Sequence, residues 1–111
     1  MRTILLLLVS AALSFAADIS GKWTFHVVLD AGSGSPAFEF QQAGEKLTGT
    51  YHGQFGEANL TGTVKGDKVE FSFGGDLGTV VYSGALEGAT KMKGTCDYAG
   101  QAKGTFTASK D

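Results

Sequence analysis

The chain of 111 residues is predicted to be all-β and to form an eight-stranded antiparallel up-and-down β-barrel. Apolar and polar residues alternate with period two over eight segments, which is the pattern of strands with one buried face. The connections are too short for a crossover helix, so neighbouring strands should pair antiparallel. The 17 glycines and single proline are typical of many short strands joined by turns. A two-sheet sandwich is the alternative fold.

Residues 1–16 are expected to be a signal peptide that lies outside the fold. Arg2 supplies a positive charge, residues 4–9 are an unbroken apolar run, and residues 14–16 (Ser-Phe-Ala) form a small-x-small cleavage site. The apolar run is too short for a membrane-spanning helix. We therefore expect a single domain over residues 17–111 that is secreted or periplasmic and not embedded in a membrane.

The strands follow one another with turn-forming residues between them. They are expected, in chain order, at residues 19–29, 36–43, 46–54, 58–65, 68–74, 78–87, 91–98 and 101–109. The stretch DAGSGSP predicts a long first loop over residues 30–36. The shorter runs AGE, FGE, KGDK, GGDLG, EGAT and YAGQ predict the remaining connections.

The alternation on each strand assigns an inward face. Taken strand by strand, that face carries Trp23, Phe25, Val27 and Leu29; Phe38 and Phe40; Leu47 and Tyr51; Leu60 and Val64; Val69, Phe71 and Phe73; Val80, Tyr82 and Leu86; Met92, Cys96 and Tyr98; Ala102 and Phe106. The opposite face carries mainly threonine, serine and charged residues, together with His26 and His52. A membrane barrel has the reverse arrangement, apolar outside and polar inside.

A central glycine recurs on the inward face of five strands, at Gly49, Gly62, Gly84, Gly94 and Gly104. The other three strands place Phe25, Phe40 and Phe71 at about the same height. An eight-stranded barrel is only just wide enough for side chains to fill it. The glycines are therefore expected to make room for the three rings and to let the strands coil. The alternative is that they leave room for a ligand.

The first strand resembles the calycin barrels, which are the lipocalins and avidins, through the Gly-x-Trp of GKWT at residues 21–24. LTGTY is similar to the third-strand Gly-Thr-Tyr of avidin and streptavidin, and LTGTV, VVYSGAL and GTFTASK are similar to later strands. The resemblance implies the same barrel topology, with a ligand at the top. It places Tyr51 at one biotin-contacting position, but Phe25 and Phe106 stand where the family has asparagine and tryptophan. Biotin binding is therefore not implied.

The residues that could carry chemistry do not form a catalytic site, and we expect no enzyme activity and no cofactor. The inward face has no Asp or Glu in mid-strand, so neither a catalytic triad nor a hydrolytic carboxylate pair can be assembled. His26 and His52 are expected to be surface residues and not metal ligands. Cys96 is expected to be a buried apolar residue, and a single cysteine excludes an internal disulfide.

Charge also limits the partners. With Arg2 in the leader, eight lysines remain against 11 acidic residues. Nucleic-acid binding requires a basic cluster, which this composition does not provide. The partner is therefore expected to be a small apolar ligand or another protein, and the sequence does not indicate an oligomeric state.

The candidate site is the top of the barrel, where strands meet at residues 30–36, 54–57, 74–78 and 98–101. The inward residues proposed to contact a ligand there are Leu29, Phe38, Tyr51, Phe55, Phe73 and Tyr98. The hypothesis is a module that binds an apolar or aromatic small molecule, with Phe55 partly plugging the mouth.

Two alternatives stay open. One is a secreted interaction or inhibitor module that uses the loops at 30–36 and 74–78. The other is an envelope structural protein without a discrete ligand. A deep pocket among Tyr51, Phe73 and Tyr98 would favour the small-molecule hypothesis.

Overall fold

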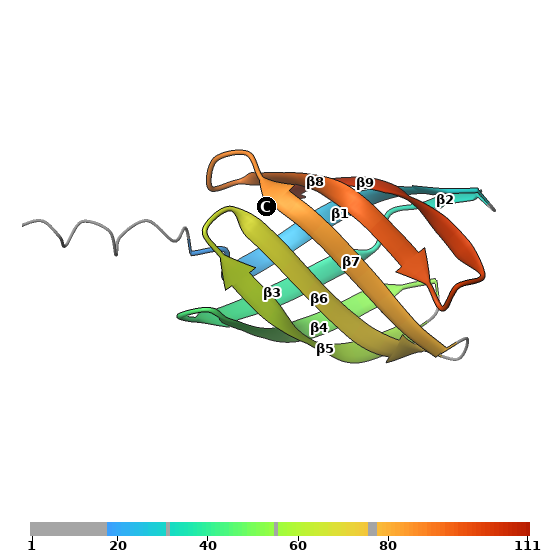
Figure 1. Cartoon of the computed structure of the whole chain (residues 1–111), viewed down its shortest axis with the longest axis horizontal. Coiled ribbons are helices and arrows are strands. Elements are labelled where there is room, and N and C mark those ends of the chain that lie inside the picture. The colour runs from blue at the N-terminus through green and yellow to red at the C-terminus, as the bar shows by residue number, and fades with distance from the viewer. Residues whose placement is uncertain (1–17, 31, 55, 76–77) are drawn as a thin grey trace, which may run out of the picture.

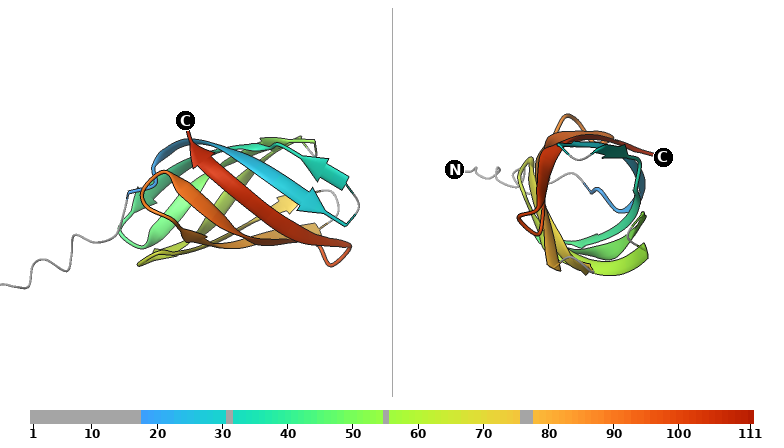
Figure 2. Two further views of the ribbon diagram at one scale, coloured as in Figure 1. Left: turned by 90° about the horizontal axis from the view of Figure 1, so that it is seen from above. Right: turned by 90° about the vertical axis from the view of Figure 1, so that its right-hand side faces the viewer.

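A computed structural model describes residues 18–30, 32–54, 56–75 and 78–111, so the expected leader lies outside the described residues. The described part is all-β, as predicted. Its strands are β1 (Gly21–Leu29), β2 (Gly32–Gly34), β3 (Ala37–Ala43), β4 (Lys46–Gly53), β5 (Gly56–Lys65), β6 (Lys68–Gly75), β7 (Gly78–Leu86), β8 (Lys91–Tyr98) and β9 (Ala102–Lys110). From β3 to β9 each strand pairs antiparallel with the next, and β1 pairs with both β3 and β9. The sheet therefore closes on itself, as Figure 1 shows from the side and Figure 2 shows end-on.

β2 and β3 together form one of eight positions around the barrel. Both pair with β1 in the same register, since Gly34 lies opposite Val27 and Ala37 lies opposite Thr24. The other edge of β1 pairs with β9 from Trp23 to Leu29. The ladder continues between β2 and β3, where the Phe25 amide donates to the Pro36 carbonyl at 3.0 Å.

The predicted barrel of eight strands is therefore confirmed, but the prediction of a long loop over residues 30–36 is wrong. Residues 32–34 of that stretch form strand β2, which pairs with the end of β1. Its glycines and serines offer no apolar alternation, so the pattern that identified the other strands is missing here.

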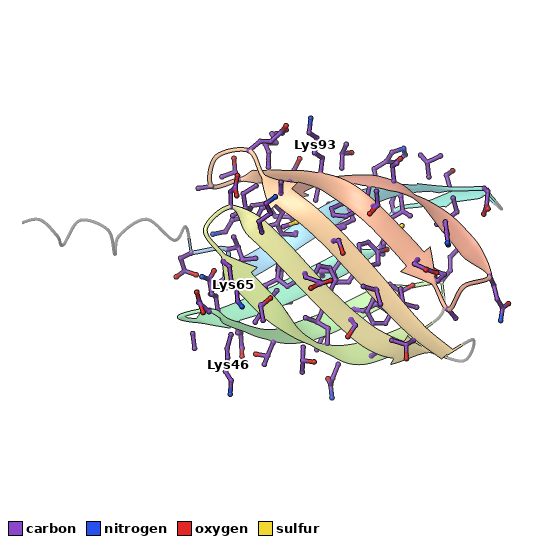
Figure 3. All side chains as sticks on the ribbon, viewed as in Figure 1. Lys46, Lys65 and Lys93 are labelled. Carbon is purple, nitrogen blue, oxygen red and sulfur yellow. The ribbon has the colours of Figure 1, made fainter. Side chains whose placement is uncertain are left out.

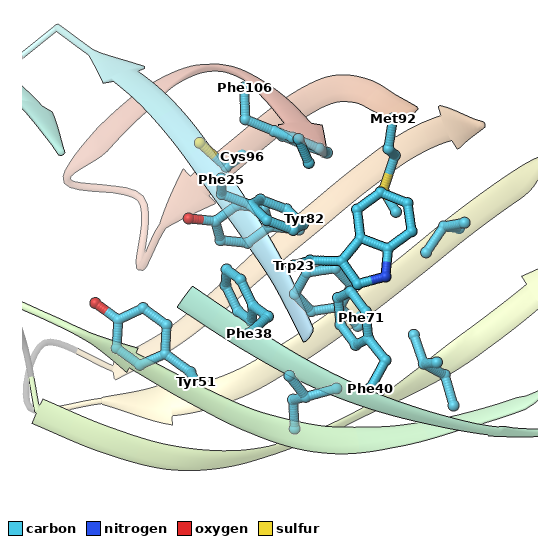
Figure 4. Packing of buried hydrophobic residues seen from close by; sticks show 14 of the residues in the cluster. Trp23, Phe25, Phe38, Phe40, Tyr51, Phe71, Tyr82, Met92, Cys96 and Phe106 are labelled. Atoms are coloured by element: carbon cyan, nitrogen blue, oxygen red, sulfur yellow. The ribbon is translucent and has the colours of Figure 1, made fainter. Parts of the chain in front are cut away.

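The barrel interior is filled with side chains. All the residues assigned to the inward face are buried except Leu29 and Ala102, which are partly buried, and the prediction missed the buried Ile19 and Ala108. Phe25 lies at the centre, with the centroids of five other rings 4.4–6.1 Å away. Figure 4 shows these rings packed together between the strands. Burial of one such aromatic side chain stabilises the fold by about 1.5–3 kcal/mol.

The five central glycines are required mainly by close backbone contacts. A Cβ atom added to Gly49, Gly62, Gly94 or Gly104 would lie 1.9–2.1 Å from a carbonyl oxygen of the adjacent strand. Only at Gly84 is the nearest atom from an aromatic ring, the Cζ of Phe106 at 2.8 Å. The close backbone contacts at four positions agree with the expectation that glycine lets the strands coil, whereas Gly84 makes room for Phe106, which is not one of the three rings predicted.

The barrel is covered at the end where β1 begins, which we call the floor end. Ile19 has no solvent-exposed surface, and its carbonyl accepts a hydrogen bond from the Trp23 indole at 2.9 Å. Its amide donates to the Gln42 side chain at 3.0 Å, and the Gln42 amide donates to the Ser20 hydroxyl at 3.0 Å. Residues 18–20 therefore lie across this opening and are held there by hydrogen bonds to β1 and β3.

The outer surface is polar, and Figure 3 shows Lys46, Lys65 and Lys93 projecting from it. His26 and His52 are exposed, as predicted, and the Nδ1 of His52 lies 3.2 Å from a Glu57 carboxylate oxygen. Within the described ranges, Val28 is the one large hydrophobic residue that is exposed, at 49%. No helix in the described part of the chain is long and apolar enough to cross a membrane.

Candidate functional site

A pocket of about 420 Å³ lies at the mouth, the end of the barrel where β1 meets β2 and β8 meets β9. We call it the mouth pocket. Its lining residues come from four segments of the chain and are Val27, Leu29, Gly32, Ser33, Gly34, Ser35, Pro36, Tyr51, Gly53, Gln54, Tyr98, Gln101 and Ala102. The volume lies within the range of about 300–1,000 Å³ that is usual for small-molecule sites.

The position formed by β2 and β3 contributes to the hollow because it has no large inward side chain near the mouth. On the β2–β3 line, Phe38 and Phe40 face inward, and the alternation continues through the buried Pro36 to Gly34 and Gly32. A Cβ atom added at Gly34 would have its nearest neighbour, the Gln54 side chain, at 3.9 Å. An added Cβ at Gly34 would therefore make only an ordinary van der Waals contact, in contrast to the conflicts at the central glycines.

Tyrosines form the base of the pocket. The Tyr51 ring stacks on the buried Phe73 ring, with the centroids 4.3 Å apart and an interplanar angle of 18°. Its hydroxyl reaches toward the mouth over Gly53, where an added Cβ would lie 2.3 Å from that oxygen. Figure 4 shows the hydroxyls of Tyr51 and Tyr82 pointing to the same side of the aromatic cluster. The rings therefore present both apolar faces and polar atoms to the pocket.

The Tyr98 hydroxyl shares a hydrogen bond with that of Tyr82 below it. Tyr82 has no exposed surface and Tyr98 is 3% exposed. Burial raises the pKa of Tyr98 to about 12 and raises the pKa of Tyr82 further. Both phenols therefore stay protonated at neutral pH, when they can donate and accept hydrogen bonds without carrying charge.

The structure brings three of the six predicted site residues together at the pocket, namely Leu29, Tyr51 and Tyr98. Phe38 and Phe73 are buried beneath and do not line it. Phe55 lies outside the described residues, so its predicted role as a plug stays a prediction.

Sequence reasoning placed residues 30–36, 54–57 and 98–101 at this end of the barrel, but its predicted ligand contacts did not include residues 32–36, Gln54, Gln101 or Ala102, which line the pocket. The wall follows β1 closely along the chain, since Leu29 pairs with Gly32. The criterion set by the sequence is a deep pocket among Tyr51, Phe73 and Tyr98; two of these three residues line the mouth pocket, and Phe73 is buried beneath Tyr51.

The lining suits binding by shape and hydrogen bonding. Its 13 residues include no lysine, arginine, histidine, aspartate or glutamate. The described residues also contain no group of three or more His, Cys, Asp or Glu side chains that could hold a metal ion. Cys96 is buried, and burial raises the pKa of its thiol to about 11.

Solved structures of designed barrels are similar to this chain. A redesigned β-barrel, b11L5F_LGL, has a TM-score of 0.69 and 18% identity over 84% of this chain and 91% of that chain. A redesigned barrel bound to DFHBI, mFAP0, has a TM-score of 0.63 and 18% identity over 83% and 98%. A de novo designed fluorescence-activating β-barrel has a TM-score of 0.64 and 15% identity over 94% and 100%.

At these identities the comparisons establish the barrel fold. No protein-family model matches the chain, and neither does any curated protein sequence. The resemblance to avidins and lipocalins therefore stays a prediction.

Proposed function

We propose that this protein is a small-molecule-binding barrel whose ligand, an apolar or aromatic compound, enters the mouth pocket. The observation that carries the proposal is an open pocket of about 420 Å³ with two tyrosines at its base, above a fully packed core. A mostly apolar hollow with a few fixed polar groups is the usual form of a ligand site. Ligand binding by another chain of this fold, the barrel solved with DFHBI, is consistent with the proposal.

The pocket favours a small molecule over the loop-based protein interaction considered from the sequence. That alternative relied on loops at residues 30–36 and 74–78, and in the first of them residues 32–34 are instead strand β2, paired with β1. The wall that it forms lines the same pocket as the two tyrosines. A concave surface suits a ligand that can be largely surrounded.

The test is to fill the pocket without disturbing the core. Gly34→Leu adds a side chain where the structure has room, and Gly74→Leu adds the same side chain at an exposed glycine of β6 with no atom within 4 Å of the added Cβ. Binding of the uncharged dye Nile red is measured by fluorescence titration. We expect Gly34→Leu to weaken binding at least about tenfold, a loss of about 1.4 kcal/mol, and Gly74→Leu to leave it unchanged. Dye binding unchanged in Gly34→Leu, or absent in the wild type, would refute the proposal.

We also propose that the protein is exported, on the strength of the charged start, apolar run and small-x-small site within residues 1–16. Expression of the full chain in a secreting host should yield a product whose mass lacks these residues. A product that retains them in the cytoplasm would contradict the proposal.

A further inference from the structure

We infer, building on the proposed function, that the mouth pocket selects an uncharged aromatic molecule with an amide beside its ring. The ring would lie against Tyr51 and Tyr98, and the amide would pair with the outer backbone edge of β2. The inference depends on two further observations, the absence of charge among the described lining residues and a strand edge in the same pocket that no described strand pairs with.

The charge distribution disfavours an ionised ligand. No lining residue carries a charge, so a charged group inside the pocket would lose hydration without gaining a counterion. Seven of the eight lysines lie on the halves of their strands toward the floor end, where Figure 3 labels Lys46, Lys65 and Lys93. Near the mouth, Lys103 is accompanied by the acidic residues Asp30, Glu57 and Asp97. An anion therefore finds no cluster of positive charge at the entrance.

The unpaired edge follows from the hydrogen-bond alternation of antiparallel strands. The hydrogen bond between Phe25 and Pro36 identifies the residue pairs that are hydrogen-bonded along this ladder. Because every second pair is bonded, Gly34 is hydrogen-bonded to Val27 and Gly32 to Leu29. The N–H and C=O groups of the intervening Ser33 and of Ser35 then point away from β1.

No strand in the described part of the chain pairs with the outer edge of β2. On that side β4 reaches only to Gly53, where it turns back into β5. Within residues 18–30, 32–54, 56–75 and 78–111, β1 is the one strand that pairs with β2, and no turn or loop hydrogen bond involves the backbone of Ser33 or Ser35. Ser33 and Ser35 are exposed. A strand edge of this kind is a template for another backbone-like group.

A single small molecule can contact both features. Ser33, Ser35, Tyr51 and Tyr98 line the same pocket. The backbone of Ser33 and that of Ser35 each offer an N–H donor and a C=O acceptor side by side. An amide offers the complementary acceptor and donor. A ring that carries an amide therefore matches the tyrosines with its apolar part and β2 with its polar part.

The test compares four indoles that differ in charge and in the amide groups that they carry, by isothermal titration calorimetry at pH 7. N-acetyltryptophanamide is neutral and carries two amides, 3-methylindole is neutral and carries none, N-acetyltryptophan is an anion that keeps one amide, and tryptamine is a cation without an amide. We expect the amide to bind about tenfold more tightly than 3-methylindole, and both ions to bind more weakly than the neutral amide. Equal affinity of the amide and 3-methylindole, or tightest binding by either ion, would overturn the inference.

A backbone variant tests the role of β2. Ser33→Pro removes one edge N–H that makes no bond to β1, and Ser33→Ala keeps that N–H while removing the hydroxyl. We expect Ser33→Pro to abolish the advantage of the amide over 3-methylindole and Ser33→Ala to retain it, with circular dichroism confirming the fold. The advantage persisting in folded Ser33→Pro would contradict the inference.

Amide chemical shifts provide a second measurement that requires no variant. The Ser33 and Ser35 amide signals should move on addition of N-acetyltryptophanamide to the wild type and stay in place with 3-methylindole. If neither signal responds to the amide, the inference fails. Wild-type binding of Nile red that is lost in Gly34→Leu, without selection among the indoles, would refute this inference and leave the proposed function standing. Absence of binding by the dye and all four indoles would refute both.

Discussion

Gly62→Val is expected to be severely destabilising, because the space over this glycine is occupied by the backbone of the next strand. An added Cβ would lie 2.1 Å from the Glu70 carbonyl oxygen and 2.6 Å from the Cα and Cβ atoms of Phe71. Phe71 is itself fixed by stacking on Tyr82, with centroids 5.1 Å apart, and is 2% exposed. Neither strand can move aside without disturbing the aromatic core.

The magnitude follows from the kind of atoms that would have to move. Overpacking typically costs about 1–3 kcal/mol and occasionally more. A conflict with backbone atoms, enlarged by the two further methyl groups of valine, places Gly62→Val at about 3 kcal/mol or above. For a domain of this size such a loss lowers the melting temperature by roughly 12–24 °C.

Gly74→Val is the matched control in a urea or thermal unfolding experiment. Gly74 also lies within a strand, β6, but it is exposed and has no atom within 4 Å of an added Cβ. Valine there is expected to be neutral or stabilising by less than about 1 kcal/mol, since β-branched residues favour strands. Equal unfolding midpoints for the two variants would show that the layer around Gly62 is hollow and would refute the packing argument.

Four further predictions concern single groups. Cys96, 4% exposed, should react slowly with a thiol reagent in the native state and rapidly after denaturation, and fast native labelling would mean that β8 is out of register. Burial raises the pKa of Tyr98 to about 12 from its ordinary value of 10.0, so the unfolded chain loses this proton first. Stability measured by urea unfolding should therefore be full below pH 10 and fall as the pH rises through 12, whereas a flat profile would contradict the burial of this phenol. Ile19→Ala should cost about 2–5 kcal/mol and shift Trp23 fluorescence to longer wavelength, and unchanged emission would show that residues 18–20 do not cover the floor end. Phe55→Ala should change stability little and should increase Nile red binding, and unchanged binding would remove Phe55 from the mouth.

The sequence predicted the barrel because the interior is apolar and because apolar residues alternate with polar ones along the strands. Residues such as Trp23, Phe71 and Tyr82 identify both their strand and their face, and each is buried as expected. The site was only partly predictable for a related reason. Tyr51 and Tyr98 belong to the same alternation, whereas the wall at residues 32–36 is defined by backbone pairing that glycine and serine do not reveal.

Glycine has opposite roles in the fold and in the site, and the sequence pattern does not separate them. Both Gly34 and Gly62 take inward positions on a strand, but the nearest atom to an added Cβ is 3.9 Å away at Gly34 and 2.1 Å away at Gly62. The first distance is an ordinary van der Waals contact, and the second is a conflict with backbone. Gly62 therefore lets the barrel close, while Gly34 keeps the mouth pocket hollow.

Stability and binding should accordingly be separable at these two glycines. Gly34→Leu is expected to keep its free energy of unfolding within about 1 kcal/mol of the wild type, because the added side chain buries apolar surface in space that is already present. The same variant should lose Nile red binding, since leucine occupies the volume between β2 and the tyrosines. Unfolding and dye titration on one preparation measure both quantities. If Gly34→Leu were as destabilising as Gly62→Val, the mouth would be packed like the core and no site could be placed there.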